Sequence, residues 1–180
     1  MTRQGEEPIP SRSQLFPHLN TRISVPYGRA VNPVTGTNWE GVGIIPDVAV
    51  SADQALETAH LMALRGVRDG EIDPRRKFDL DWAIAELESV LHPVTVDSEV
   101  LASYVGTYGP RSLSMRDGQL FYQRAPSTPL RAIPMNATLF RFEGVSNFRL
   151  EVVLDESGQP VKLVGQFDNG RTDESPRSGG

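Results

Sequence analysis

Glu40 is the side chain whose setting best suits chemistry, in the stretch of residues 31–50, VNPVTGTNWEGVGIIPDVAV. It follows Trp39 and precedes a Gly-Val-Gly sequence that leads into an apolar run. A carboxylate placed in this way either accepts backbone amide hydrogen bonds at a turn or orients a catalytic base. The residues alone favour the structural role, because an orienting carboxylate needs a nucleophile and a base beside it.

A nucleophile to accompany Glu40 is not evident in the sequence. The chain has no cysteine, which excludes thiolate nucleophiles, disulfides and cysteine metal sites. A serine elbow of the form Gly-x-Ser-x-Gly is absent, and the closest sequence, around Ser146 (GVSNF), lacks the second glycine. We interpret that sequence as a hairpin turn between two strands.

Metal and cofactor motifs are also missing. The histidines, His18, His60 and His92, do not form a His-x-x-x-His pair, so a zinc site is not predicted. A phosphate-binding loop is not predicted either, because the sequence around Gly41 and Gly43 lacks the remaining glycine of the motif. The sequence therefore predicts no cofactor and no metal.

Composition describes a folded globular chain, with 180 residues of which 38% are apolar and 23% are charged. A net charge of −5 argues against nucleic acid as a partner, because phosphate binding requires clustered Lys and Arg. No apolar run reaches the roughly 18 residues that a membrane span needs. The first residues lack the apolar core of a signal peptide, and the compartment stays open.

Two helices are predicted between residues 51 and 91. The first begins at Ser51, whose sequence through Gln54 has the form of a capping box. Its apolar face contains Ala52, Ala55, Leu56, Ala59, Met62 and Ala63. A polar loop over 70–77 follows, and the second helix, 80–91, ends before Pro93. Two pairs of carboxylates, Asp79 with Asp81 and Glu86 with Glu88, are two residues apart on this helix, so we predict solvated charges rather than acid–base pairs.

From residue 97 the pattern changes to a short helical turn followed by short alternating segments. Asp117-Gly118 is a strong signal for a two-residue hairpin. The predicted strands are 111–115, 119–124, 130–135, 138–143, 147–154 and 161–167. Six short strands at this spacing predict a small antiparallel β-barrel or sandwich, and the fold class is α+β.

One part of the sequence resembles a known family. Residues 26–47, PYGRAVNPVTGTNWEGVGIIPD, resemble the end of the catalytic domain in tail-specific serine peptidases, the family of C-terminal-processing proteases and tricorn core domains. The sequences HPVTVD and LASYVGTYGPR, at 92–97 and 101–111, resemble a small β-domain appended to some bacterial members.

This resemblance implies a division of the chain. Residues 1–19 are an irregular lead-in, 20–69 the end of a peptidase catalytic domain, and 70–96 a linker and helix. Residues 97–170 are the small antiparallel β-domain, and 171–180 are a disordered tail.

The resemblance also implies a role for Glu40, which matches the late Glu that orients a Ser-His-Ser-Glu tetrad in tricorn-like members. Other members use a Ser-Lys dyad, and the choice stays open. The serine and base motifs of the family lie upstream of the part that matches, so the chain is expected to be inactive alone. Peptide or protein is the substrate in the family, whose bacterial members are often exported. Uncovered strands around Ile23 and Ile44 are expected to favour self-association.

A second hypothesis is a non-enzymatic β-module that binds a peptide or an apolar ligand. The aromatic residues that could line its site are Tyr108, Phe121, Tyr122, Phe140 and Phe148. Aromatic residues on alternating strands more often form a core, and a barrel filled by its own side chains would count against this hypothesis.

Overall fold

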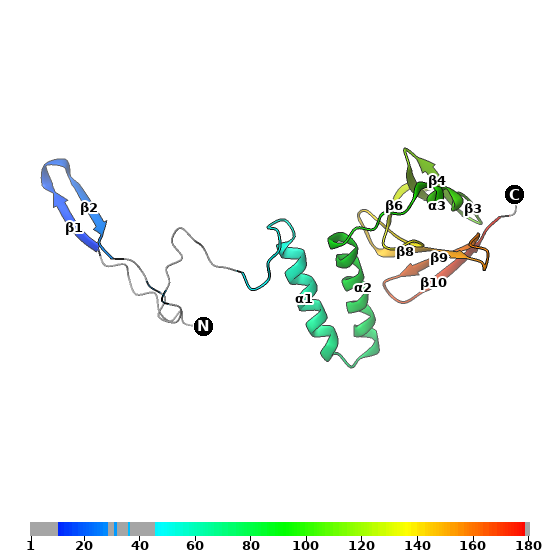
Figure 1. Ribbon diagram of the computed structural model, residues 1–180, viewed down its shortest axis with the longest axis horizontal. Helices are drawn as coiled ribbons and strands as arrows, with labels where there is room; N and C mark the ends of the chain where they lie inside the picture. The colour runs from blue at the N-terminus through cyan, green and yellow to red at the C-terminus, as the bar shows by residue number, and fades with distance from the viewer. Residues whose placement is uncertain (1–10, 29–30, 32–35, 37–45, 179–180) are drawn as a thin grey trace. The chain divides into compact units, whose positions relative to one another are not determined.

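A computed structural model of the chain describes residues 11–28, 31, 36 and 46–178. The chain divides into two compact units, residues 1–49 and residues 50–180. Figure 1 shows the helices and strands of both units. Glu40 and Ile44 lie outside the described residues.

In the first unit, β1 (Ser11–Phe16) and β2 (Thr21–Pro26) form an antiparallel hairpin joined by the 3-10 turn η1 (Pro17–Leu19). Asn20 closes the turn with a φ of 46°, a left-handed conformation that Asn tolerates better than most residues. The alternation of Ile23 and Val25 with polar residues predicts a half-buried strand over 21–27, and β2 confirms that strand. The irregular lead-in predicted up to residue 19 is wrong for 11–16, because β2 offers these residues a strand to pair with.

The hairpin buries very little apolar surface. The sequence predicted a half-buried strand here, but every residue of β2 is exposed, including Ile23 at 49% and Val25 at 58%. Leu15, on the opposite strand, is also exposed. Alternation of apolar and polar residues identified the strand, yet the described residues supply no surface that covers its apolar side.

The second unit begins with a helical hairpin, α1 (Ala55–Gly70) and α2 (Pro74–Leu91). α1 starts four residues later than predicted, because the Ser51 hydroxyl bonds the Gln54 side chain instead of a backbone amide. α2 starts six residues earlier than predicted. Asp73 accepts a hydrogen bond from the amide of Arg76 at 2.9 Å and Pro74 takes the first helical position, so the predicted loop over 70–77 shrinks to a tight turn.

The predicted apolar face of α1 is not the face that packs against α2. Leu61 is the buried residue of α1, whereas Leu56 and Met62 are exposed at 76% and 51%. Arg65 and Arg68 link α1 to α2 through ion pairs with Glu88 and Asp81. α1 therefore meets α2 with a partly charged face and leaves its most apolar face uncovered by the described residues.

After α2 come a short helix, α3 (Ser98–Ser103), and one eight-stranded antiparallel sheet. Each strand pairs with the next along the chain, so the order is β3 through β10 without a crossover. The strands are β3 (Gly106–Tyr108), β4 (Arg111–Arg116), β5 (Gln119–Arg124), β6 (Leu130–Pro134), β7 (Leu139–Phe142), β8 (Val145–Leu154), β9 (Pro160–Phe167) and β10 (Thr172–Pro176). All six predicted strands are confirmed, with ends that differ by at most two residues.

The sheet curves into a nearly closed barrel, and its closure involves the segment predicted to be disordered. That prediction for 171–180 is wrong over 172–176, which form β10 and pair with β9. Beyond β10, the amide of Ser178 donates to the Thr107 carbonyl of β3 at 2.8 Å. The first and last strands of the sheet therefore meet, as expected of an up-and-down barrel.

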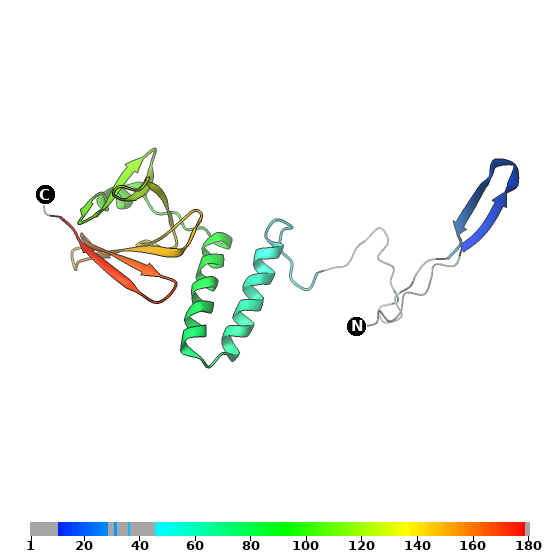
Figure 2. The ribbon, with the colours of Figure 1, turned by 180° about the vertical axis from the view of Figure 1, so that it is seen from behind.

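Inward-facing side chains fill the barrel. The buried apolar cluster consists of Leu101 and Tyr104 from α3 and of Tyr108, Leu113, Leu120, Tyr122, Ala132, Phe140, Phe142, Leu150, Val152 and Leu163 from the strands. It contains no residue of α1 or α2. Figure 2 shows the barrel on one side of α2 and α1 on the other. The barrel with α3 thus has its own core, and the helical hairpin contacts it from outside.

Candidate functional site

The predicted catalytic residue, Glu40, lies outside the described residues, so its surroundings are known from sequence alone. Within the described part of the chain, no serine hydroxyl is hydrogen-bonded to a histidine or a lysine. Ser89 donates to the Glu86 carbonyl at 2.7 Å, Ser103 to the Val100 carbonyl, and Ser157 to the Asp155 carboxylate. A hydroxyl that donates to a carbonyl is not activated for attack. The described residues therefore present no nucleophile with its general base.

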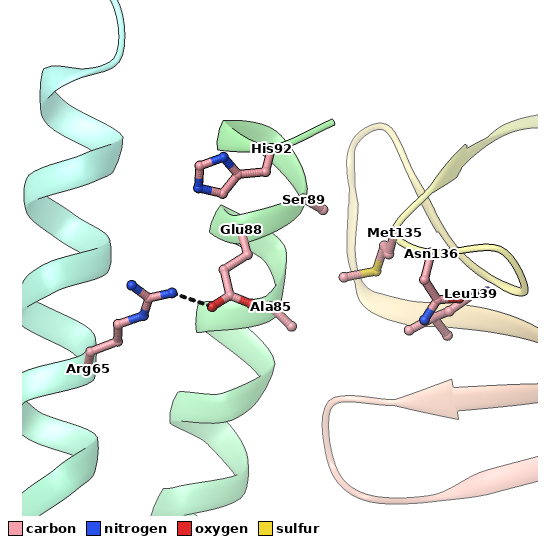
Figure 3. A pocket seen from close by; sticks show the side chains of 8 residues that line it. All are labelled: Arg65, Ala85, Glu88, Ser89, His92, Met135, Asn136 and Leu139. Atoms are coloured by element: carbon pink, nitrogen blue, oxygen red, sulfur yellow. Dashed lines mark hydrogen bonds and ion pairs between the residues drawn. The ribbon is translucent and has the colours of Figure 1, made fainter. Parts of the chain in front are cut away.

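A pocket of about 410 Å³ lies at the C-terminal end of α2. Its lining residues come from both helices and from the β6–β7 connection: Arg65, Ala85, Glu88, Ser89, His92, Met135, Asn136 and Leu139 (Figure 3). In this view Arg65, Glu88 and His92 lie on the side of α2 that faces α1. Ala85 and Ser89 lie on the opposite side, toward Met135 and Leu139. In this view α2 thus separates Arg65, Glu88 and His92 from Met135 and Leu139.

The polar groups of this pocket are largely occupied. Arg65 Nη2 lies 2.7 Å from Glu88 Oε1, and both side chains are about half exposed. Asn136 Oδ1 accepts from the amides of Thr138 and Leu139, which makes it part of a turn. These bonds stabilise the β6–β7 loop and the pair of helices. They leave no charged group of the described residues beside Met135 and Leu139, where it could orient a ligand.

The interior of the barrel holds a buried polar cluster around Arg111, whose side chain is 1% exposed. Its guanidinium donates to Asp173 Oδ1 at 2.5 Å, to Ser175 Oγ at 3.2 Å and to the Tyr122 hydroxyl at 3.3 Å. Burial by itself lowers the pKa of Arg111, but the hydrogen bonds to Asp173 and Tyr122 outweigh it and the pKa is raised. Arg111 therefore stays charged and joins β4 to β10 across the barrel.

A glycine makes this cluster possible. A Cβ at Gly165 would lie 2.3 Å from Asp173 Oδ1, 2.7 Å from Arg111 Nη2 and 2.9 Å from a ring carbon of Phe148. These distances are too short for real contacts. Gly165 therefore gives the ion pair and the Phe148 ring the space they occupy.

A second cluster joins α2 to the outside of the barrel. Glu86 lies 3.4 Å from Arg141 of β7 and 3.4 Å from Arg149 of β8. Arg149 also donates to the Trp82 carbonyl at 2.6 Å, and its guanidinium carbon is 3.8 Å from the centre of the Trp82 ring. Burial lowers the pKa of Arg149, and Glu86 opposes that effect.

The prediction of solvated carboxylates on α2 is therefore wrong for Glu86. Asp79, Asp81 and Glu88 pair with arginines at the helix surface, where each is about half exposed. Glu86 instead faces two arginines that the barrel strands largely bury. The spacing correctly predicted that carboxylates two residues apart point to different sides of the helix. It could not predict which side the barrel covers.

The aromatic residues considered for a ligand site mostly belong to the barrel core. Tyr108, Tyr122 and Phe140 are buried in the apolar cluster, and Phe148 packs against it. Phe121 lies outside the buried cluster, with the guanidinium of Arg116 over its ring. The barrel interior is thus filled by its own side chains, the outcome that counts against a ligand-binding module.

Arg111, Asp173 and Arg149 were all missed by the analysis of sequence. Apolar periodicity does not select charged residues, and a buried arginine in a strand looks like any other polar position. One signal was available for Arg149, which lies between Phe148 and Leu150 in a strand, whereas Arg111, between Pro110 and Ser112, offered none. Their carboxylate partners lie far away in sequence, so spacing could not identify them.

The residues that the structure describes contain no group of three or more His, Cys, Asp or Glu side chains that could hold a metal ion. Among the described helices, none is both long enough and apolar enough to cross a membrane. The chain matches no protein-family model, and a search of solved structures likewise found no match.

Proposed function

We propose that this chain is the C-terminal portion of a tail-specific serine peptidase, an endopeptidase whose nucleophile and general base are supplied by sequence upstream of residue 20. The observation that carries the proposal is the sequence of residues 26–47, PYGRAVNPVTGTNWEGVGIIPD, with its Asn-Trp-Glu-Gly centre. The substrate class is peptide or protein. The barrel is the small C-terminal domain appended to the catalytic part.

Apolar surface that the described residues leave uncovered, on both sides of this stretch, supports the proposal. Ile23 and Val25 precede it and are about half exposed, and Leu56 and Met62 follow it with half or more of their surface exposed. Large exposed apolar side chains that gather on one element mark a surface made for contact. A catalytic domain that packs against β2 and α1 accounts for all four residues.

In this proposal Glu40 orients the catalytic base of a Ser-His-Ser-Glu tetrad. A buried carboxylate that accepts a hydrogen bond from an imidazole holds the ring in the required tautomer and stabilises its protonated form. Without the imidazole and the serine the carboxylate has nothing to orient. The 180-residue chain is accordingly inactive.

Labelling with a fluorophosphonate probe tests the absence of a working serine. We expect no labelling of the purified chain and no cleavage of a panel of unstructured peptides, measured by mass spectrometry. A protease of known activity, labelled in parallel, serves as the positive control. Cleavage that persists after removal of contaminating proteases, together with labelling of a serine in this chain, would contradict the proposal.

The coding region that precedes Met1 provides the positive test. We expect an in-frame extension that encodes a serine on a strand-to-helix turn and a Lys or His base. In the extended protein, Glu40→Gln should lower kcat by about a hundredfold if the site is a tetrad. Glu57→Gln, at a partly exposed position in α1, is the matched control and should leave kcat unchanged. Equal kcat values for the two variants would show that Glu40 does not orient the catalytic base.

A further inference from the structure

The helical hairpin α1–α2, residues 55–91, is joined internally more firmly than it is joined to the barrel. Two ion pairs cross between its helices, Arg65 with Glu88 at 2.7 Å and Arg68 with Asp81 at 2.8 Å. Leu61 is buried between them. Neither helix contributes a residue to the apolar core of the barrel. The hairpin, hereafter the arm, is thus a compact element with a separate attachment.

That attachment consists mainly of polar contacts, beside a small apolar one in which Ala85 faces Met135 and Leu139. Trp82 Nε1 donates to the Ser146 carbonyl at 2.8 Å, and Arg149 donates to the Trp82 carbonyl at 2.6 Å. Arg75 donates to the Asp168 carbonyl at 3.1 Å. The Trp82 ring against the Arg149 guanidinium is the main stacked contact. Hydrogen bonds and cation–π contacts depend on direction and distance, so a small displacement removes several of them together.

Glu86 is the only carboxylate paired with the two barrel arginines in the described part of the chain. Arg141 and Arg149 both lie 3.4 Å from it, and their side chains are 16% and 6% exposed. The Nε atoms of both arginines are buried and have no hydrogen-bond partner among the described residues. Two buried guanidinium groups share one carboxylate, which leaves an excess positive charge at this contact.

A connection free of regular structure joins the arm to the barrel. Residues 93–97, Pro-Val-Thr-Val-Asp, are neither helix nor strand, and of these only Val96 is partly covered by the barrel core. The helix α3 that follows is packed on the barrel through Leu101 and Tyr104. The backbone between Pro93 and Val96 can therefore change direction without disturbing the packing of α2 against α1 or of α3 against the barrel.

We propose that the arm is hinged at residues 93–96, is held on β7 and β8 by the Glu86–Arg141–Arg149 cluster, and leaves the barrel as one unit when that cluster is broken. The barrel keeps its fold when this happens, because its core contains nothing from the arm. Release uncovers the two arginines on neighbouring strands. Before release, Glu86 acts together with the hydrogen bonds of Trp82 and Arg75 to fix the position of the arm on the barrel.

Hydrogen exchange followed by mass spectrometry tests this inference on the full 180-residue chain. Glu86→Gln removes the charge that the two arginines share, and amides of α1 and α2 should exchange about tenfold faster or more while those of β4–β9 keep their rates. Asp79→Asn is the matched control, since it also removes a carboxylate charge from α2 but breaks only a half-exposed pair with Arg75 on the same helix. Its exchange should stay close to that of the parent chain.

Trp82 offers a second measurement that does not depend on a variant of the cluster. The chain has two tryptophans, so Trp39→Phe leaves Trp82 as the single indole. In increasing urea the Trp82 emission should shift to the red before the near-ultraviolet signal of the barrel tyrosines is lost. Coincident transitions of the two signals would overturn the inference, as would equal exchange in the Glu86→Gln and Asp79→Asn chains.

Discussion

The hairpin β1–β2 and the barrel are both antiparallel sheets built from alternating sequences, but their burial differs completely. In β2, Ile23 and Val25 alternate with polar residues and remain about half exposed. In β7, Phe140 and Phe142 alternate with Leu139 and Arg141 and are almost fully buried. Alternation therefore specifies a strand and its two faces, while stability comes from the element that covers the apolar face.

The largest difference between the two regions should appear on truncating an apolar residue in each. Phe140→Ala leaves a large cavity in the barrel core and should lower the free energy of unfolding by about 3–5 kcal/mol. Ile23→Ala in the hairpin should change it by less than about 0.5 kcal/mol. Urea unfolding monitored by circular dichroism measures both. A cost above about 2 kcal/mol for Ile23→Ala would show that β2 is covered by part of this chain.

Two glycine substitutions compare a tightly packed backbone position in the barrel with an open one in α1. Gly165→Ala forces a Cβ against the Arg111–Asp173 pair and should destabilise the barrel by about 1–3 kcal/mol. Gly66→Ala in α1 meets no atom within 4 Å and removes a helix-interior glycine, so it should stabilise by up to about 1 kcal/mol. Thermal unfolding distinguishes the two signs. An unchanged free energy of unfolding in Gly165→Ala would mean that the Arg111–Asp173 pair moves aside without destabilising the barrel.

The smallest effect contrasts two turns. The β8–β9 turn is fixed by Asp155, whose carboxylate accepts from the Ser157 hydroxyl at 2.7 Å and from the amides of Gln159 and Ser157 at 2.9 Å. The Ser157 hydroxyl first, and then these amides, hold the pKa of Asp155 below its ordinary value. No carboxylate accepts such bonds among the described residues of the β1–β2 turn at Asn20.

Because the folded-state pKa of Asp155 is depressed, its contribution to stability is present above the unfolded pKa and is lost as pH falls through the folded pKa. Ser157→Ala should raise the pKa of Asp155 toward its ordinary value, as measured by carboxyl NMR during a pH titration. An unchanged titration would show that the backbone amides alone hold the carboxylate. Ser13→Ala in the hairpin is the control and should leave Asp155 unaffected.

Most of the barrel could be predicted because its signals are local. Asp117-Gly118 fixes one hairpin, and six segments alternate clearly enough to be located within two residues. β10 could not be found in this way, because its inward residues are Asp173 and Ser175, which bond Arg111 instead of joining an apolar core. A strand whose inward residues are polar does not show the alternation of apolar residues by which strands are predicted.

The helical hairpin shows both limits of sequence reasoning. The start of α2 was predictable in principle, since Asp73 followed by Pro74 is a cap and a first-turn proline. The orientation of α1 was not, because its most apolar face is the exposed one. Of the proposed catalytic site only Glu40 could be selected, and the selection depends on a resemblance, since the sequence contains no recognisable nucleophile or base motif to accompany it.

Hydrogen exchange of the unmodified 180-residue chain tests most directly the claim that the barrel is self-sufficient while the β1–β2 hairpin needs a covering surface. Amides of β4–β9 should be protected by many orders of magnitude, in proportion to the free energy of unfolding. Amides of β1 and β2 should exchange within about tenfold of an unstructured peptide, because an isolated hairpin is marginally stable in water. Comparable protection of the two regions would contradict the account.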